Sequence, residues 1–123
     1  EKLPKSLIIR TLPNGESKKS KNWGNTNPTY LHSDFTNKLV ERGVEHLLVD
    51  LPSVDKEIDG GTLLSHRAFF RVPEAPRTEA TITEFVFIPN EVQDGLYALN
   101  LQLAPFDLDA SPSRPVIYPL SVI

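Results

Sequence analysis

The chain has 123 residues, of which 39% are hydrophobic and 24% are charged, and its formal net charge is −3. This length and composition are typical of one small domain with a real core, and they exclude disorder over the whole length. The mild charge excludes a basic face for nucleic acid, and no apolar run approaches the roughly 20 residues that cross a membrane. The absence of cysteine excludes disulfides and fits a reducing, cytoplasmic compartment.

The first predicted elements are a strand and a polar loop. Residues 6–12 contain a short apolar run rich in β-branched side chains, and Pro-Asn-Gly turn chemistry follows it, which predicts a strand. Residues 16–27 are polar and rich in Lys, Ser and Asn. The basic run in this loop, which begins at Lys18, is expected to be solvated.

A helix is predicted to begin at Asn27 and Pro28, because asparagine caps the first amides of helices and proline suits the first turn. Gly43 provides the expected stop. The apolar side chains of this segment are spaced for one helical face and consist of Leu31, Phe35, Leu39 and Val40.

The rest of the chain predicts a layered α/β arrangement. Residues 46–51 predict a strand, and the apolar run Leu47-Leu48-Val49 within it lacks alternation, which indicates that both faces are covered. A helix before such a strand suggests a crossover unit. Residues 62–70 predict a short helix. Further strands are predicted at residues 80–88, 95–104 and 116–123, and Pro119 places the last of them at an edge.

Glu84 is the first candidate for chemistry. In the predicted strand 80–88 it shares a face with Ile82 and Val86, so its carboxylate would lie on a buried surface. An unpaired buried charge is costly, and the partner would be a metal, a cation or a set of donors. The alternative is a glutamate at the end of a strand that reaches solvent.

His66 is the second candidate, in the short apolar helix 62–70. Imidazole is the commonest metal-binding side chain, and together with a carboxylate it makes a plausible zinc or manganese half-site. The alternative is a hydrogen-bonded core histidine. Sequence separation does not decide whether His66 and Glu84 meet, and no residue can be named as the acceptor that would orient the imidazole.

The remaining candidates have simpler interpretations. His32 is expected to be solvated, and His46 is expected to make a backbone contact at the start of a strand. An acidic cluster follows that strand, and it is interpreted as structural rather than as a calcium or magnesium site because its spacing is not that of an EF-hand. The cluster consists of Asp50, Asp55, Glu57 and Asp59.

Several blocks of the sequence together resemble the cyclase-like family of metal-dependent hydrolases, which includes bacterial kynurenine formamidases and isatin hydrolases. They run in the order found in that family and cover most of the chain after Pro28. The blocks are residues 43–55 (GVEHLLVDLPSVD), 59–69 (DGGTLLSHRAF), 80–84 (ATITE) and 104–116, the last around APF and DASPSRPV.

The resemblance implies a swivelling β/β/α fold, of which residues 1–123 would be the C-terminal portion, with a mixed sheet and flanking helices in a single domain. It implies hydrolysis of an amide or lactam bond with zinc or manganese. His66 and Glu84 match the positions from which family members supply a histidine and a glutamate, so both are predicted to be metal ligands and catalytic residues.

One departure from the family qualifies this interpretation. The main metal motif of the family, H-x-G-T-H-x-D, belongs to its N-terminal half and does not occur in this sequence, which also contains no methionine. An upstream segment is therefore expected, and the present chain alone is expected to be inactive and to self-associate as a homo-oligomer. The alternative is a non-catalytic pseudoenzyme or interaction domain that retains the scaffold.

Overall fold

The computed structural model describes residues 2–120, and the chain divides into two compact units, Glu1–Ile88 and Pro89–Ile123. The first unit contains a three-stranded parallel sheet, two α-helices and one short 3-10 helix. The second contains a two-stranded antiparallel sheet. No helix within residues 2–120 has the length and apolar character needed to cross a membrane.

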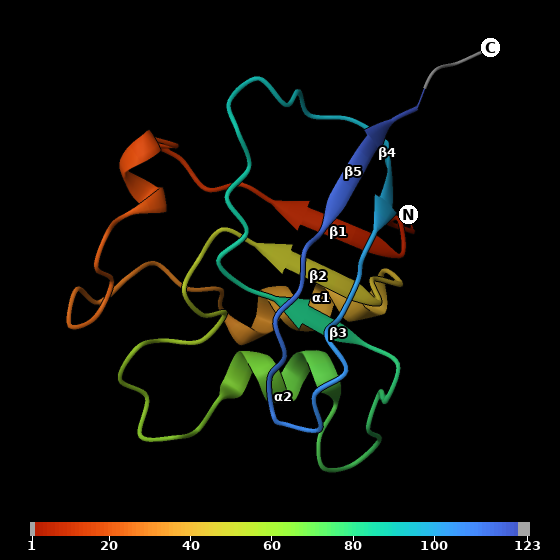
Figure 1. Ribbon diagram of the computed structural model, residues 1–123. Coiled ribbons are helices and arrows are strands. Elements are labelled where there is room, and N and C mark those ends of the chain that lie inside the picture. Colours follow the sequence, from red (N-terminus) through yellow and green to blue (C-terminus); the bar gives the residue numbers. More distant parts are fainter. Residues whose placement is uncertain (1, 121–123) are drawn as a thin grey trace. The chain divides into compact units, whose positions relative to one another are not determined.

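The parallel sheet has the strand order β1-β2-β3, and its arrows run in one direction in Figure 1. The strands are β1 (Ser6–Ile9), β2 (His46–Val49) and β3 (Thr81–Thr83). Helix α1 (Ser33–Glu41) connects β1 to β2, and α2 (Leu64–Phe70) connects β2 to β3. These two crossovers agree with the predicted α/β class, because parallel neighbours need a long connection that is usually a helix.

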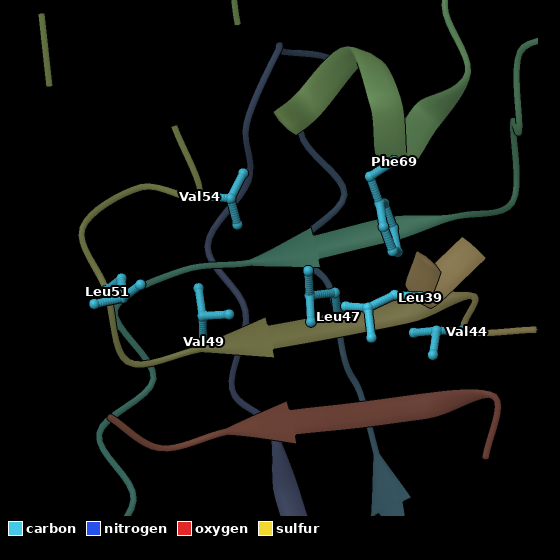
Figure 2. Close-up of a cluster of buried hydrophobic side chains, with 7 residues drawn as sticks. All are labelled: Leu39, Val44, Leu47, Val49, Leu51, Val54 and Phe69. Atoms are coloured by element: carbon cyan, nitrogen blue, oxygen red, sulfur yellow. The ribbon is translucent and has the colours of Figure 1, made fainter. Parts of the chain in front are cut away.

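The core lies between this sheet and the two helices. Leu7, Leu47 and Ile82 occupy the same register row across the three strands, so their side chains point to one face. Figure 2 shows Leu39 of α1 and Phe69 of α2 meeting the β2 side chains that belong to this face. The buried residues of this cluster are Leu39, Val44, Leu47, Val49, Leu51, Val54 and Phe69.

Strand β2 confirms the prediction of a strand covered on both faces. Leu47, Leu48 and Val49 are all fully buried, although successive side chains point to opposite sides of the sheet. A central parallel strand is buried in this way, and its continuous apolar run follows from that position.

Helix α1 begins later than predicted. The amides of Asn25 and Asn27 donate to the carboxylate of Glu57, and Asn27 has a left-handed φ of 48°, so this stretch is held outside the helix. The helix starts after His32, whose Nδ1 accepts from the amide of Asp34 at 3.3 Å. The predicted stop is confirmed, because Gly43 follows the helix with a φ of 92°.

Strand β3 is shorter than the predicted strand 80–88. It ends at Thr83, and Phe85 then adopts a left-handed φ of 58°, which breaks the alternation expected from the sequence. The amide of Phe85 instead donates to the carbonyl of Leu51 at 2.9 Å. Glu84 therefore lies directly beyond the end of the strand, at a point where the chain changes direction.

The basic loop that follows β1 is not simply solvated, contrary to the prediction. Lys18 lies in the 3-10 helix Glu16–Lys19, and its Nζ is 2.9 Å from Oδ2 of Asp50. Only 14% of the Lys18 side chain and 1% of the Asp50 side chain are exposed. Thr11 donates to the same carboxylate through its amide and its hydroxyl. This buried ion pair ties the loop to the end of β2.

The second unit forms its own small sheet. Strands β4 (Tyr97–Asn100) and β5 (Val116–Pro119) pair antiparallel, and both are shorter than predicted. Among the described residues they form a sheet separate from the parallel one, whereas the prediction was a single mixed sheet. The edge position expected for Pro119 is confirmed, because β5 pairs with β4 alone in this sheet. Predicted strand residues 121–123 lie outside the described residues.

Candidate functional site

The candidate site lies at the carboxyl ends of β2 and β3. Asp55 belongs to the loop that follows β2, and Glu84 follows β3 directly. His66 lies in the first turn of α2, which the same loop enters. Sites in α/β proteins gather at this end of parallel strands, because the strands present their last residues at one edge of the sheet.

The structure brings His66 and Glu84 together, although 17 residues separate them in the sequence. Nε2 of His66 is 3.6 Å from Oε1 of Glu84. This separation exceeds the usual 2.7–3.2 Å of a hydrogen bond, so the two atoms face each other without a direct bond of ordinary length. Both side chains are partly exposed.

Asp55 holds the other side of the imidazole. Its Oδ2 is 2.6 Å from Nδ1 of His66 and accepts from the amide of His66 at 3.1 Å. Its Oδ1 accepts from the amide of Ser65 at 2.6 Å. Asp55 is buried. The interpretation of the acidic cluster as merely structural therefore missed a direct contact between Asp55 and His66.

A missing cap is the signal that could have identified Asp55 from the sequence. Residue Leu63 precedes α2 and has no side chain able to cap the first amides, in contrast to the usual Ser, Thr, Asp or Asn. A short helix without a local cap needs an acceptor from elsewhere, and acidic residues in the preceding loop are the natural source. The structure supplies Asp55, which accepts from two amides of the first turn.

Glu84 is positioned by the same loop that carries Asp55. The amide of Val54 donates to Oε1 of Glu84 at 2.9 Å, and Val54 is fully buried in the core. Two consecutive residues therefore hold both members of the pair, Val54 through its backbone and Asp55 through its carboxylate. Because Val54 is packed against the core, the separation between His66 and Glu84 depends on the core rather than on a mobile loop.

Aromatic rings lie next to the pair. The ring of Phe70 stacks on that of His66 with centroids 6.3 Å apart, and Phe69 meets Phe70 edge to face at 5.7 Å. Phe85 follows Glu84 and is largely exposed. The imidazole is thus bounded by a carboxylate on one edge and an aromatic ring on one face, which restricts its rotation.

A turn built on Asp59 brings the chain into α2. Its carboxylate accepts from the amides of Leu63 and Gly61, both at 2.8 Å, in the manner typical of Asp-Gly turns. These hydrogen bonds, the one from Leu63 most strongly, hold the pKa of Asp59 below its usual value. Asp59 thus stabilises the turn that leads into α2.

The other candidate residues have separate roles. His32 caps α1, and His46 places Nδ1 2.9 Å from the hydroxyl of Thr81, which is a side-chain contact rather than the expected backbone contact. Asp50 is engaged by Lys18 and Thr11. These contacts join the three side chains to groups other than His66 and Glu84.

The spacing of the pair can be compared with that of two ligands of one metal ion. An imidazole nitrogen and a carboxylate oxygen are ligands that zinc accepts, and two ligands about 2.0–2.2 Å from a tetrahedral zinc lie roughly 3.3–3.6 Å apart. The separation of 3.6 Å between Nε2 and Oε1 fits this spacing. Within residues 2–120, however, no group of three or more His, Cys, Asp and Glu side chains is arranged to hold a metal ion.

Comparison with known proteins identifies relatives of the chain, although no protein-family model matches it. The chain is 36% identical to a kynurenine formamidase of Bacillus cereus over 115 residues, which are 93% of this chain and 49% of the relative. It is 35% identical to a kynurenine formamidase of Bacillus anthracis and 32% identical to that of Bacillus mycoides, with the same coverage. The chain spans about half the length of these curated relatives. It is therefore a distant homologue of the kynurenine formamidases of Bacillus, matched over about half of their length.

Proposed function

We propose that the complete protein is a metal-dependent hydrolase of amide or lactam bonds, and that this chain supplies His66 and Glu84 to its site. One observation carries the proposal: Nε2 of His66 and Oε1 of Glu84 face each other at 3.6 Å, which suits two ligands of one ion better than it suits a hydrogen bond. Homology to kynurenine formamidases supports the same reaction class.

His66 would contribute Nε2 as a ligand or as an acid/base partner, and Glu84 would contribute a ligand or bridging carboxylate. A zinc or manganese ion held by these residues would supply Lewis acidity toward an amide carbonyl and toward water. The partly exposed position of both side chains admits a substrate to this place. The substrate class proposed is an N-formyl aromatic amine, with a lactam as the second possibility.

The 123-residue chain alone is expected to bind a divalent ion weakly, because catalytic zinc sites usually have three protein ligands and this pair provides two. Calorimetric titration of the chain with Zn²⁺ and with Mn²⁺ measures this. We expect dissociation constants above the micromolar range. A submicromolar site that Glu84→Ala abolishes would contradict the expectation of an incomplete site.

In the protein translated from the whole coding region, Glu84→Gln is expected to lower kcat/KM for N-formylkynurenine about 100-fold, because the amide cannot act as an anionic ligand or base. The measurement is the initial rate of deformylation at several metal concentrations. Glu45→Gln is the matched control, since Glu45 lies in an exposed ion pair with Lys5. Equal effects of the two substitutions would exclude Glu84 from the site.

The competing proposal is a non-catalytic protein that retains the scaffold. The coding region upstream of residue 1 separates the two proposals. An intact H-x-G-T-H-x-D segment there favours the hydrolase, because it would supply the remaining ligands. Its absence, together with no hydrolysis of either an N-formyl amine or a lactam, favours the interaction domain.

A further inference from the structure

We propose that Asp55 is the positioning residue of His66: it keeps a proton on Nδ1 and thereby reserves Nε2 for the ion shared with Glu84. The inference rests on the proposed function for the identity of that ion. The placement of the proton, in contrast, follows from the contacts of the chain itself and can be measured without any metal.

The shortest contact of the imidazole is with Asp55. Nδ1 of His66 and Oδ2 of Asp55 are 2.6 Å apart, which is a hydrogen-bond distance. An ionised carboxylate can only accept, so Nδ1 must donate in this contact. The hydrogen bond made by one ring nitrogen sets the state of the other, and in a neutral imidazole Nε2 then carries the lone pair.

The other ring nitrogen, Nε2, faces Glu84. With the proton on Nδ1, the lone pair of Nε2 and the carboxylate oxygen of Glu84 are two acceptors at 3.6 Å. Two acceptors repel unless a cation lies between them. The amide of Val54 fixes the glutamate side of this pair, so the carboxylate is not free to turn away while that bond is kept. The arrangement therefore favours positive charge between Nε2 and Glu84, which either a proton or a metal ion can supply.

Asp55 also caps α2, and this second role requires a test that separates the two. Removing its carboxylate would weaken the helix start, since loss of a cap costs about 1 kcal/mol. A purely structural role predicts lower stability and no specific change in the imidazole. A positioning role predicts that the proton moves from Nδ1 to Nε2, because Oε1 of Glu84 would then be the carboxylate oxygen that faces the ring.

The experiment is a long-range ¹H–¹⁵N correlation spectrum of the histidines in the metal-free 123-residue chain, recorded at about pH 9, where a free imidazole is neutral. His66 is assigned by its loss in His66→Gln. In the unsubstituted chain we expect Nδ1 of His66 to be protonated. In Asp55→Ala we expect Nδ1 to be unprotonated and Nε2 to carry the proton.

Asp59→Ala is the matched control, because Asp59 accepts two backbone amides in the same loop and does not contact His66. It should leave the proton on Nδ1 while it perturbs the turn. An unprotonated Nδ1 in the unsubstituted chain overturns the proposal even if no variant folds, and so does a protonated Nδ1 in folded Asp55→Ala. Failure of the hydrolase assay alone overturns the proposed function and leaves the assignment of this proton intact.

Discussion

Replacing Phe69 by alanine is expected to lower the free energy of unfolding by about 3–5 kcal/mol. Phe69 is fully buried in the cluster between the helices and the sheet, where Figure 2 shows its ring pointing toward β2. Its ring also packs under the guanidinium of Arg77 at 4.9 Å. The substitution removes the apolar contacts and leaves a cavity that the neighbouring helix and strands fill only in part. Urea unfolding followed by circular dichroism measures the loss.

Phe85→Ala is the matched control for this prediction. It removes the same atoms from the same unit, but 63% of the Phe85 residue is exposed, so little buried contact is lost. We expect a change of less than about 0.5 kcal/mol, as for most exposed positions. If both variants lost similar stability, or if Phe69→Ala changed the urea midpoint only slightly, the core described between α2 and β2 would be wrong.

Replacing Lys18 by methionine is expected to lower the free energy of unfolding by about 3–5 kcal/mol, because it leaves the buried carboxylate of Asp50 without its cation. Methionine preserves most of the length of the side chain, so the loss reports charge and hydrogen bonds more than packing. Nζ of Lys18 also reaches the carbonyl of Thr11 at 2.6 Å, and that acceptor loses its donor as well. The urea midpoint at neutral pH gives the measurement.

Lys19→Met tests whether burial is the cause. The neighbouring lysine pairs with Glu16, but 52% of its side chain is exposed, and its Nζ lies 4.6 Å from the centroid of the Phe87 ring. Exposed ion pairs contribute about 0–1 kcal/mol, and an exposed cation–π contact contributes a similar amount. A loss for Lys19→Met as large as that for Lys18→Met would show that the two lysines have equivalent surroundings, contrary to the structure.

The sequence predicted the elements whose signals are local. The apolar run at Leu47, Leu48 and Val49 indicated a strand covered on both faces, and the structure confirms it. Gly43 ended the preceding helix as expected, since its positive φ suits glycine. Element boundaries were predicted less well. The start of α1 was misplaced because Glu57 binds the amides of Asn25 and Asn27, and contacts 32 and 30 residues away leave no local signal.

The candidate site was predicted in part. His66 and Glu84 were named from their residue types, from the pattern around them and from a family resemblance, but nothing in the sequence placed one beside the other. Their proximity depends on β2 and β3 being parallel neighbours and on the loop after β2, which hydrogen-bonds to both side chains through Val54 and Asp55. Asp55 was assigned to a structural cluster, because a carboxylate eleven residues before a histidine is not a recognisable motif.

The amino-acid sequence by itself determined the α/β class, the buried central strand and the two residues proposed for chemistry, since periodicity and residue type are properties of a short stretch of chain. Only the tertiary structure decided which polar groups meet. The contacts of Asp55 with His66, of Val54 with Glu84 and of Lys18 with Asp50 join residues 11, 30 and 32 positions apart. Such pairs form because a polar group that is removed from water requires a partner, and packing of the core determines which partner is within reach.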